Sequence, residues 1–126
     1  MRHILIALLI LALCLSIGIY SSVQIRNAIT PTLNCLRLSR IHGAQRHFSL
    51  ALDAVEDAAE HWRKHDVLFG VFLRHDETDE VMRAFARLKE YARYAEDEEF
   101  AGACSELIAT LQHISAMQLP RGENLL

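Results

Sequence analysis

Residues 48–62 read FSLALDAVEDAAEHW, and the spacing of their apolar residues decides the fold class. A helix of 3.6 residues per turn brings positions three and four residues apart onto one face. Acidic residues lie between the apolar ones, so the opposite face is polar. The stretch therefore predicts an amphipathic helix over about residues 45–65. Its inward positions follow in steps of four, three, four and three: Phe48, Leu52, Val55, Ala59 and Trp62.

The same spacing recurs twice downstream, and it predicts one helix over about residues 77–95 and another over about 97–117. Only the short stretch 94–97 joins them, so we expect an antiparallel hairpin. Asp76 followed by Asp79 resembles a capping arrangement at the start of the first of these helices. The inward positions are Val81, Phe85, Leu88, Ala92 and Ala95 in the first, and Phe100, Cys104, Leu107, Leu111 and Ile114 in the second.

The connection between these helices and residues 45–65 is the apolar run VLFGVFL at 67–73. Periodicity alone does not separate a buried strand from a helical turn in so short a run. Because helices are predicted on both sides of it, we expect a helical or irregular segment that packs into the core.

Upstream, Thr30 and Pro31 have the pattern of an N-cap followed by proline at the first helical position. They predict a helix over about residues 31–42, with Leu33 and Leu36 inward and Gly43 at its end. No proline occurs between Pro31 and Pro120, and no run alternates long enough to predict a sheet.

The first residues of the chain have a different composition. Residues 4–20 read ILIALLILALCLSIGIY, of which 15 of 17 are apolar, and no charge follows until Arg26. About 20 helical residues cross the hydrocarbon core of a bilayer. A cleaved signal peptide is an alternative, with Ser16-Ile17-Gly18 as its cleavage site, whereas Leu13 before Cys14 is a poor match to a lipoprotein signal. An uncleaved anchor fits best.

The predicted fold class is therefore all-α: an N-terminal transmembrane helix followed by a small antiparallel helical bundle of about four helices. Residues 1–25 form the transmembrane anchor in this interpretation. Residues 26–126 form the helical bundle domain with a short C-terminal tail.

The net charge of −3 hides a split along the chain. Residues 21–52 contain four arginines and no acid, whereas residues 53–126 carry 8 basic and 16 acidic residues. The acidic half argues against nucleic acid as a partner. The arginines are candidates for contact with anionic lipid headgroups, and a solvated helix face explains them equally well. They are Arg26, Arg37, Arg40 and Arg46.

Orientation follows from the charges that flank the apolar segment. A short N-terminus with Arg2 favours an extracytoplasmic bundle, and the arginines after residue 25 oppose it. We favour the extracytoplasmic arrangement because the more distant arginines weigh less in this rule.

Few residues carry a pattern of chemistry. His61 and His65 share one helix face and, with His75, are weak candidates for a metal site, but the HExxH signature is absent and Arg63 and Lys64 would repel a cation. No phosphate-binding loop or catalytic arrangement is present, so we expect neither enzyme activity nor a cofactor. A Cys35–Cys104 disulfide is conceivable, and burial of both as small apolar side chains is the alternative.

The layout resembles a bacterial family of short, N-terminally membrane-anchored helical proteins that is catalogued as a domain of unknown function. The resemblance implies one anchored helical domain in a bacterial envelope and supplies no activity. It rests on the leading apolar helix, Trp62, the step His75-Asp76-Glu77, the run Arg87 to Tyr91, and the closing Glu123-Asn124-Leu125-Leu126.

Two functions follow as hypotheses. The first is a non-enzymatic interaction or scaffold module, held at the cell membrane by a single-pass anchor and docking another envelope protein. The alternative is an envelope sensor, a ligand- or metal-binding bundle in which the three candidate histidines respond to metal or to acid.

Overall fold

Residues 1–117 form four long helices and one short one. The computed structural model describes residues 1–117, and every regular element in that range is helical. The all-α expectation is therefore confirmed. The helices are α1 (Arg2–Ala44), α2 (Phe48–Lys64), α3 (Asp66–Phe72), α4 (His75–Arg93) and α5 (Asp97–Met117).

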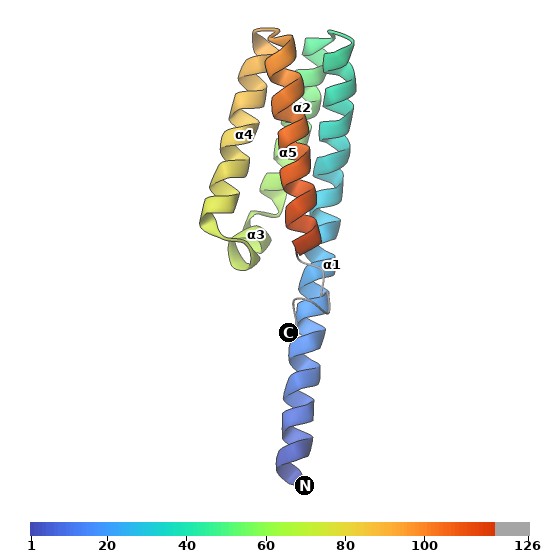
Figure 1. Ribbon diagram of the computed structural model, residues 1–126, viewed down its shortest axis with the longest axis vertical. Helices are drawn as coiled ribbons and strands as arrows, with labels where there is room; N and C mark the ends of the chain where they lie inside the picture. Colours follow the sequence, from blue (N-terminus) through green and yellow to red (C-terminus); the bar gives the residue numbers. More distant parts are fainter. Residues whose placement is uncertain (118–126) are drawn as a thin grey trace.

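The four long helices run alternately up and down as an antiparallel bundle (Figure 1). Neighbouring helices in contact are α1 with α2, α2 with α4, α4 with α5, and α5 with α1, so the four close into a ring. Only the C-terminal half of α1 belongs to this ring, and its N-terminal half projects beyond it (Figure 1). Buried residues in α1 begin at Ser21.

The expected helix start at Thr30 and Pro31 is wrong, because α1 passes through both residues without a break. The Thr30 hydroxyl caps no helix and donates instead to the carbonyl oxygen of Arg26, 2.8 Å away. A proline inside a helix forfeits one backbone hydrogen bond and costs about 3 kcal/mol. Burial of Ile29 and Leu33 on either side of it offsets that cost.

Gly43 does not end α1 either. The helix continues to Ala44, and the chain turns at Arg46, whose φ of 60° is left-handed. Gly43 instead lies against Phe100 of α5, where an added Cβ would come within 2.6 Å of a ring carbon. The glycine is needed because α1 and α5 approach closely at this point.

We therefore expect Gly43→Ala to destabilise the bundle by about 1–3 kcal/mol, the usual cost of overpacking a filled core. Gly102→Ala is the matched control, because Gly102 lies in α5 with open space around its Cα. The control removes the entropic cost of a helical glycine and stabilises by about 0.5–1 kcal/mol. Thermal unfolding of the full chain in detergent measures both, and equal shifts of the two variants would contradict the close α1–α5 contact.

The predicted inward positions lie in the core with three exceptions. Phe48 and Leu52 are only half-buried, and Phe48 packs edge-on against Phe100 with 6.1 Å between ring centroids. Ala95 is exposed, because α4 ends at Arg93 and Ala95 has a left-handed φ of 52° in the turn to α5. Several of the buried side chains of α1 and α2 are small: Ser39, Ala51, Ala54, Ala58 and Ala59.

The apolar run at 67–73 is helical as far as Phe72, in α3, and only part of it packs into the core. Phe69 is fully buried and stacks on Trp62 of α2, with ring centroids 4.1 Å apart and an interplanar angle of 22°. Val67 and Val71, in contrast, are 83% and 70% exposed. α3 therefore closes one end of the bundle with one face and leaves an apolar face uncovered.

Candidate functional site

The first candidate region is the exposed N-terminal half of α1. Every residue from 4 to 20 is exposed, and within residues 1–117 this is the one helix long and apolar enough to cross a membrane. A signal sequence has the same character. The hydroxyl of Ser16 within this segment, and those of Ser21 and Ser22 just after it, donate to carbonyl oxygens one turn earlier in the helix, over 2.8–3.0 Å. In the hydrocarbon core of a bilayer, where no water is present, polar groups must make their hydrogen bonds within the protein in this way.

The four candidate arginines lie at very different distances from this apolar segment. Arg26 is six residues beyond Tyr20 in the same helix, which places it about 9 Å further along the axis. Arg37 and Arg40 are about 25 and 30 Å beyond Tyr20. Arg46 lies in the turn at the far end and pairs with Asp97 at 3.1 Å. Lipid contact stays a prediction, and the geometry favours it for Arg26 over the other three.

Other cations lie at the end of the bundle from which the apolar half of α1 emerges. Arg63 and Lys64 end α2, and Arg74 precedes α4, so the three flank α3. All three side chains are exposed. Their position at this end of the bundle depends on the return of α2 toward the apolar half of α1, which sequence spacing alone does not show.

The candidate histidines do not converge. His65 follows the last residue of α2, and its Nδ1 lies 3.0 Å from the carbonyl oxygen of His61. His75 is the exposed first residue of α4. Across residues 1–117, no group of three or more His, Cys, Asp or Glu side chains is placed to hold a metal ion.

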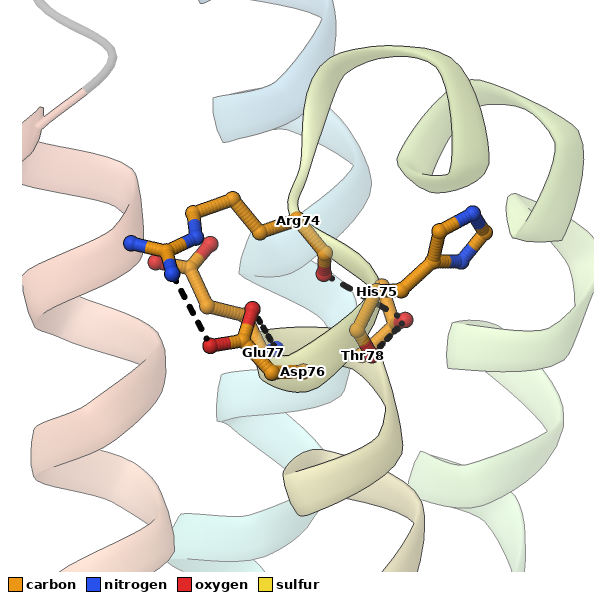
Figure 2. A network of polar contacts seen from close by, with 5 residues as sticks. All are labelled: Arg74, His75, Asp76, Glu77 and Thr78. Carbon is orange, nitrogen blue, oxygen red and sulfur yellow. Dashed lines mark hydrogen bonds and ion pairs between the residues drawn. The ribbon is translucent and has the colours of Figure 1, made fainter.

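The polar residues 74–78 lie together at the start of α4, and their contacts stabilise its first turn (Figure 2). The expected cap at Asp76 and Asp79 is wrong, since Arg74 occupies the N-cap position and makes no side-chain capping bond. The Asp76 carboxylate instead accepts the backbone N–H of Glu77 at 3.1 Å and pairs with Arg74 at 3.2 Å. Figure 2 shows the His75 ring pointing away from this pair. The Asp76 carboxylate therefore satisfies one free N–H group of the first turn, that of Glu77.

The second candidate region is a groove of about 230 Å³ between α4 and α5. Its lining combines a small apolar floor with charged side chains. The buried and half-buried lining residues are Val81, Ala84, Tyr91, Ala103, Leu107 and Thr110, and the exposed ones are Glu80, Arg87, Glu99 and Glu106.

The charges of the groove are arranged unevenly. On α4, Glu80 pairs with Arg87 at 3.1 Å and with Arg83 at 3.5 Å. On α5, Glu99 and Glu106 make no ion pair within residues 1–117. The α5 side of the groove is therefore acidic and open to a cationic side chain.

The cysteines form no disulfide. Cys104 is buried, with its Sγ 3.4 Å from the carbonyl oxygen of Leu36 and 3.5 Å from the Ser39 hydroxyl. Burial raises the pKa of the Cys104 thiol, and the Ser39 hydrogen bond and Arg40 oppose the shift in part. Burial, with the Asp57 carboxylate, also raises the pKa of Cys35. Neither environment favours a thiolate nucleophile.

Comparison with known proteins gives one positive result. The profile of a domain of unknown function, DUF4363, matches residues 39–125, which is more than half of the chain. The chain belongs to the DUF4363 family. No curated protein and no solved structure matches it.

The DUF4363 match begins at Ser39, in the last turns of α1, so the leading apolar helix lies outside it. The residues on which the resemblance rests have separate places in this DUF4363 protein. Trp62 is in the core, Tyr91 lines the α4–α5 groove, and His75, Asp76 and Glu77 form the first turn of α4. Asn124 lies outside the described residues.

Proposed function

We propose that this DUF4363 protein is a single-pass membrane protein of the bacterial envelope whose bundle is a non-catalytic docking module. One observation carries the proposal: α1 is a single helix that is exposed and apolar over residues 4–20 and a core helix from Ser21 onward. Such a helix ties the bundle directly to the bilayer, with no linker between them. The bundle is then held at a set height above the membrane.

The bundle in this proposal lies outside the cytoplasm. Arg2, on the other side of the apolar segment, favours that orientation, and two of the opposing arginines, Arg37 and Arg40, are about 25–30 Å from Tyr20 along α1. At that distance they lie beyond the headgroup layer, which extends roughly 5–8 Å past the hydrocarbon on each side. Arg26 is the opposing charge that stays close to the membrane.

The groove between α4 and α5 is the docking surface in this proposal. It has an apolar floor and the two carboxylates of Glu99 and Glu106 that make no ion pair within the described part of the chain. These features suit an envelope protein that presents a small apolar side chain next to a lysine or arginine.

Expression of the full chain with a compartment-sensitive reporter after Leu126 tests the anchor and its orientation together. We expect the protein to stay with the membrane through alkaline extraction, to retain its N-terminus by mass spectrometry, and to show reporter activity outside the cytoplasm. A soluble product that starts at Ile19 would identify a cleaved signal and refute the anchor. Reporter activity inside the cytoplasm would reverse the orientation only.

Photo-crosslinking from matched alanines tests the docking surface. Ala103 lines the groove, whereas Ala101 is exposed on the same helix outside it. A photoreactive residue at Ala103 should give an adduct with one envelope protein, and the same residue at Ala101 should not. Ala84 and Ala86 form a second such pair on α4. Equal adducts from both members of each pair would count against the groove.

A further inference from the structure

The uncovered face of α3 is the feature that the docking module leaves unexplained. Val67 and Val71 are one turn apart and are 83% and 70% exposed, and Phe72 beside them is 42% exposed. Phe69 and Leu73, on the opposite face, are buried in the core. When both faces of a helix are apolar, we expect both to be covered by apolar surroundings, and the core of the bundle covers only one face of α3.

The position of α3 in the bundle indicates what its exposed apolar face contacts. α2 runs antiparallel to α1, so counting back from the turn between them places Lys64 level with about residue 28 of α1. That level is roughly 12 Å from Tyr20 along the helix axis. α3 comes after Lys64, contacts α1, and lies at the end of the bundle nearest the apolar half of α1 (Figure 1).

The charged residues around α3 are also consistent with a position at a membrane surface. Arg63 and Lys64 on one side and Arg74 on the other are exposed, and Arg26 of α1 lies at the same end of the bundle. Lys64 pairs with Glu60 at 4.0 Å and Arg74 with Asp76 at 3.2 Å, and Asp66 and Glu77 are further acids beside them, so Arg26 and Arg63 are the cations without an ion pair within residues 1–117. An apolar patch among cations is typical of a surface that meets anionic headgroups.

We propose that α3 is an interfacial foot of the bundle, with Val67, Val71 and Phe72 at the boundary between the headgroups and the acyl chains of the bilayer that α1 spans. The inference rests on the proposed anchor. α1 and α3 together make two contacts with one membrane, and two contacts fix the tilt and rotation of the bundle, which one helix alone leaves free. The α4–α5 groove would then face a set direction.

The test uses the full chain in vesicles of phosphatidylcholine and phosphatidylglycerol, with Trp62→Phe removing the one native indole. Phe72→Trp in this background puts the probe on the α3 face and adds little apolar surface. Leu50→Trp is the matched control, because Leu50 is 49% exposed near the start of α2, at the opposite end of the bundle. Lipids brominated in the acyl chain quench only an indole that touches them.

We expect the indole at position 72 to emit at shorter wavelength than the one at position 50 and to be quenched by the brominated lipid. Adding Val67→Ser and Val71→Ser should reduce that quenching. Equal emission and quenching at the two positions would overturn the proposal. So would a blue-shifted but unquenched indole at position 72, which would mean that protein covers this face.

Flotation of the same vesicles separates this inference from the anchor. The α3 substitutions lie outside α1, so every variant should float with the vesicles to the same extent. A chain that fails to float refutes the anchor and the foot together. A chain that floats with an unquenched indole at position 72 refutes the foot alone.

Discussion

Trp62→Ala should lower the free energy of unfolding of the bundle by about 3–5 kcal/mol, the cost of deleting a fully buried large aromatic side chain. Trp62 is 1% exposed and is the largest side chain in the core. Its ring also stacks on Phe69, so the substitution leaves α3 without the surface on which it packs. The loss is a large fraction of the roughly 5–15 kcal/mol that stabilises a typical domain.

Thermal unfolding of the full chain in detergent, followed by circular dichroism, measures this loss, and we expect Tm to fall by more than about 10 °C. Tyr94→Ala is the control, since Tyr94 is aromatic but 71% exposed, and its change should stay within about 0.5 kcal/mol. A double-mutant cycle with Phe69→Ala should give a coupling of roughly 0.5–1.5 kcal/mol for the stacked pair. A Trp62→Ala variant as stable as the Tyr94→Ala variant would show that the core packs differently.

Replacing Leu9 and Leu13 with arginine should release the protein from the membrane. Each arginine near the centre of a spanning helix costs about 2.5–3.5 kcal/mol on insertion scales, so the pair costs about 5–7 kcal/mol. Leu13 is 60% and Leu9 70% exposed, and neither contributes to the bundle core. The bundle should therefore unfold at the same temperature as the unmodified one.

Membrane fractionation of cells that express the variant gives the readout. The control places two arginines at exposed apolar positions of the bundle, Leu50→Arg and Met82→Arg, and this variant should stay with the membrane. Retention of the Leu9→Arg, Leu13→Arg variant in the membrane would mean that residues 4–20 do not insert. The anchor would then have to be sought elsewhere in the chain.

The sequence by itself determined the helical class and most of the core. The four-three spacing from Phe48 to Trp62 and its repeats at Val81 and Phe100 reflect a period of 3.6 residues, which is a local property of the backbone. The start of α5 at Asp97 also followed from local signals. The segment from Ile4 to Ile25 is long and uncharged. These are properties of the sequence, so its ability to cross a bilayer can be predicted without the tertiary structure.

Several features were decided only by tertiary structure. Pro31 has the local signature of a helix start, yet burial of its neighbours against other helices outweighs the lost hydrogen bond, so α1 continues. Gly43 has the signature of a helix end, yet its place is set by the ring of Phe100, 57 residues later in the sequence. Such signals are weaker than the packing energies that oppose them.

The two surfaces assigned here also depend on distant parts of the chain. The groove joins Arg87 and Tyr91 of α4 to Glu99 and Glu106 of α5, and sequence spacing did not show that these four residues share a surface. In the proposed arrangement, the face of α3 reaches the membrane only because α2 returns the chain to the end of the bundle from which the apolar half of α1 emerges (Figure 1). Periodicity reports which residues are apolar along one helix, whereas the antiparallel packing of whole helices decides what each apolar face covers.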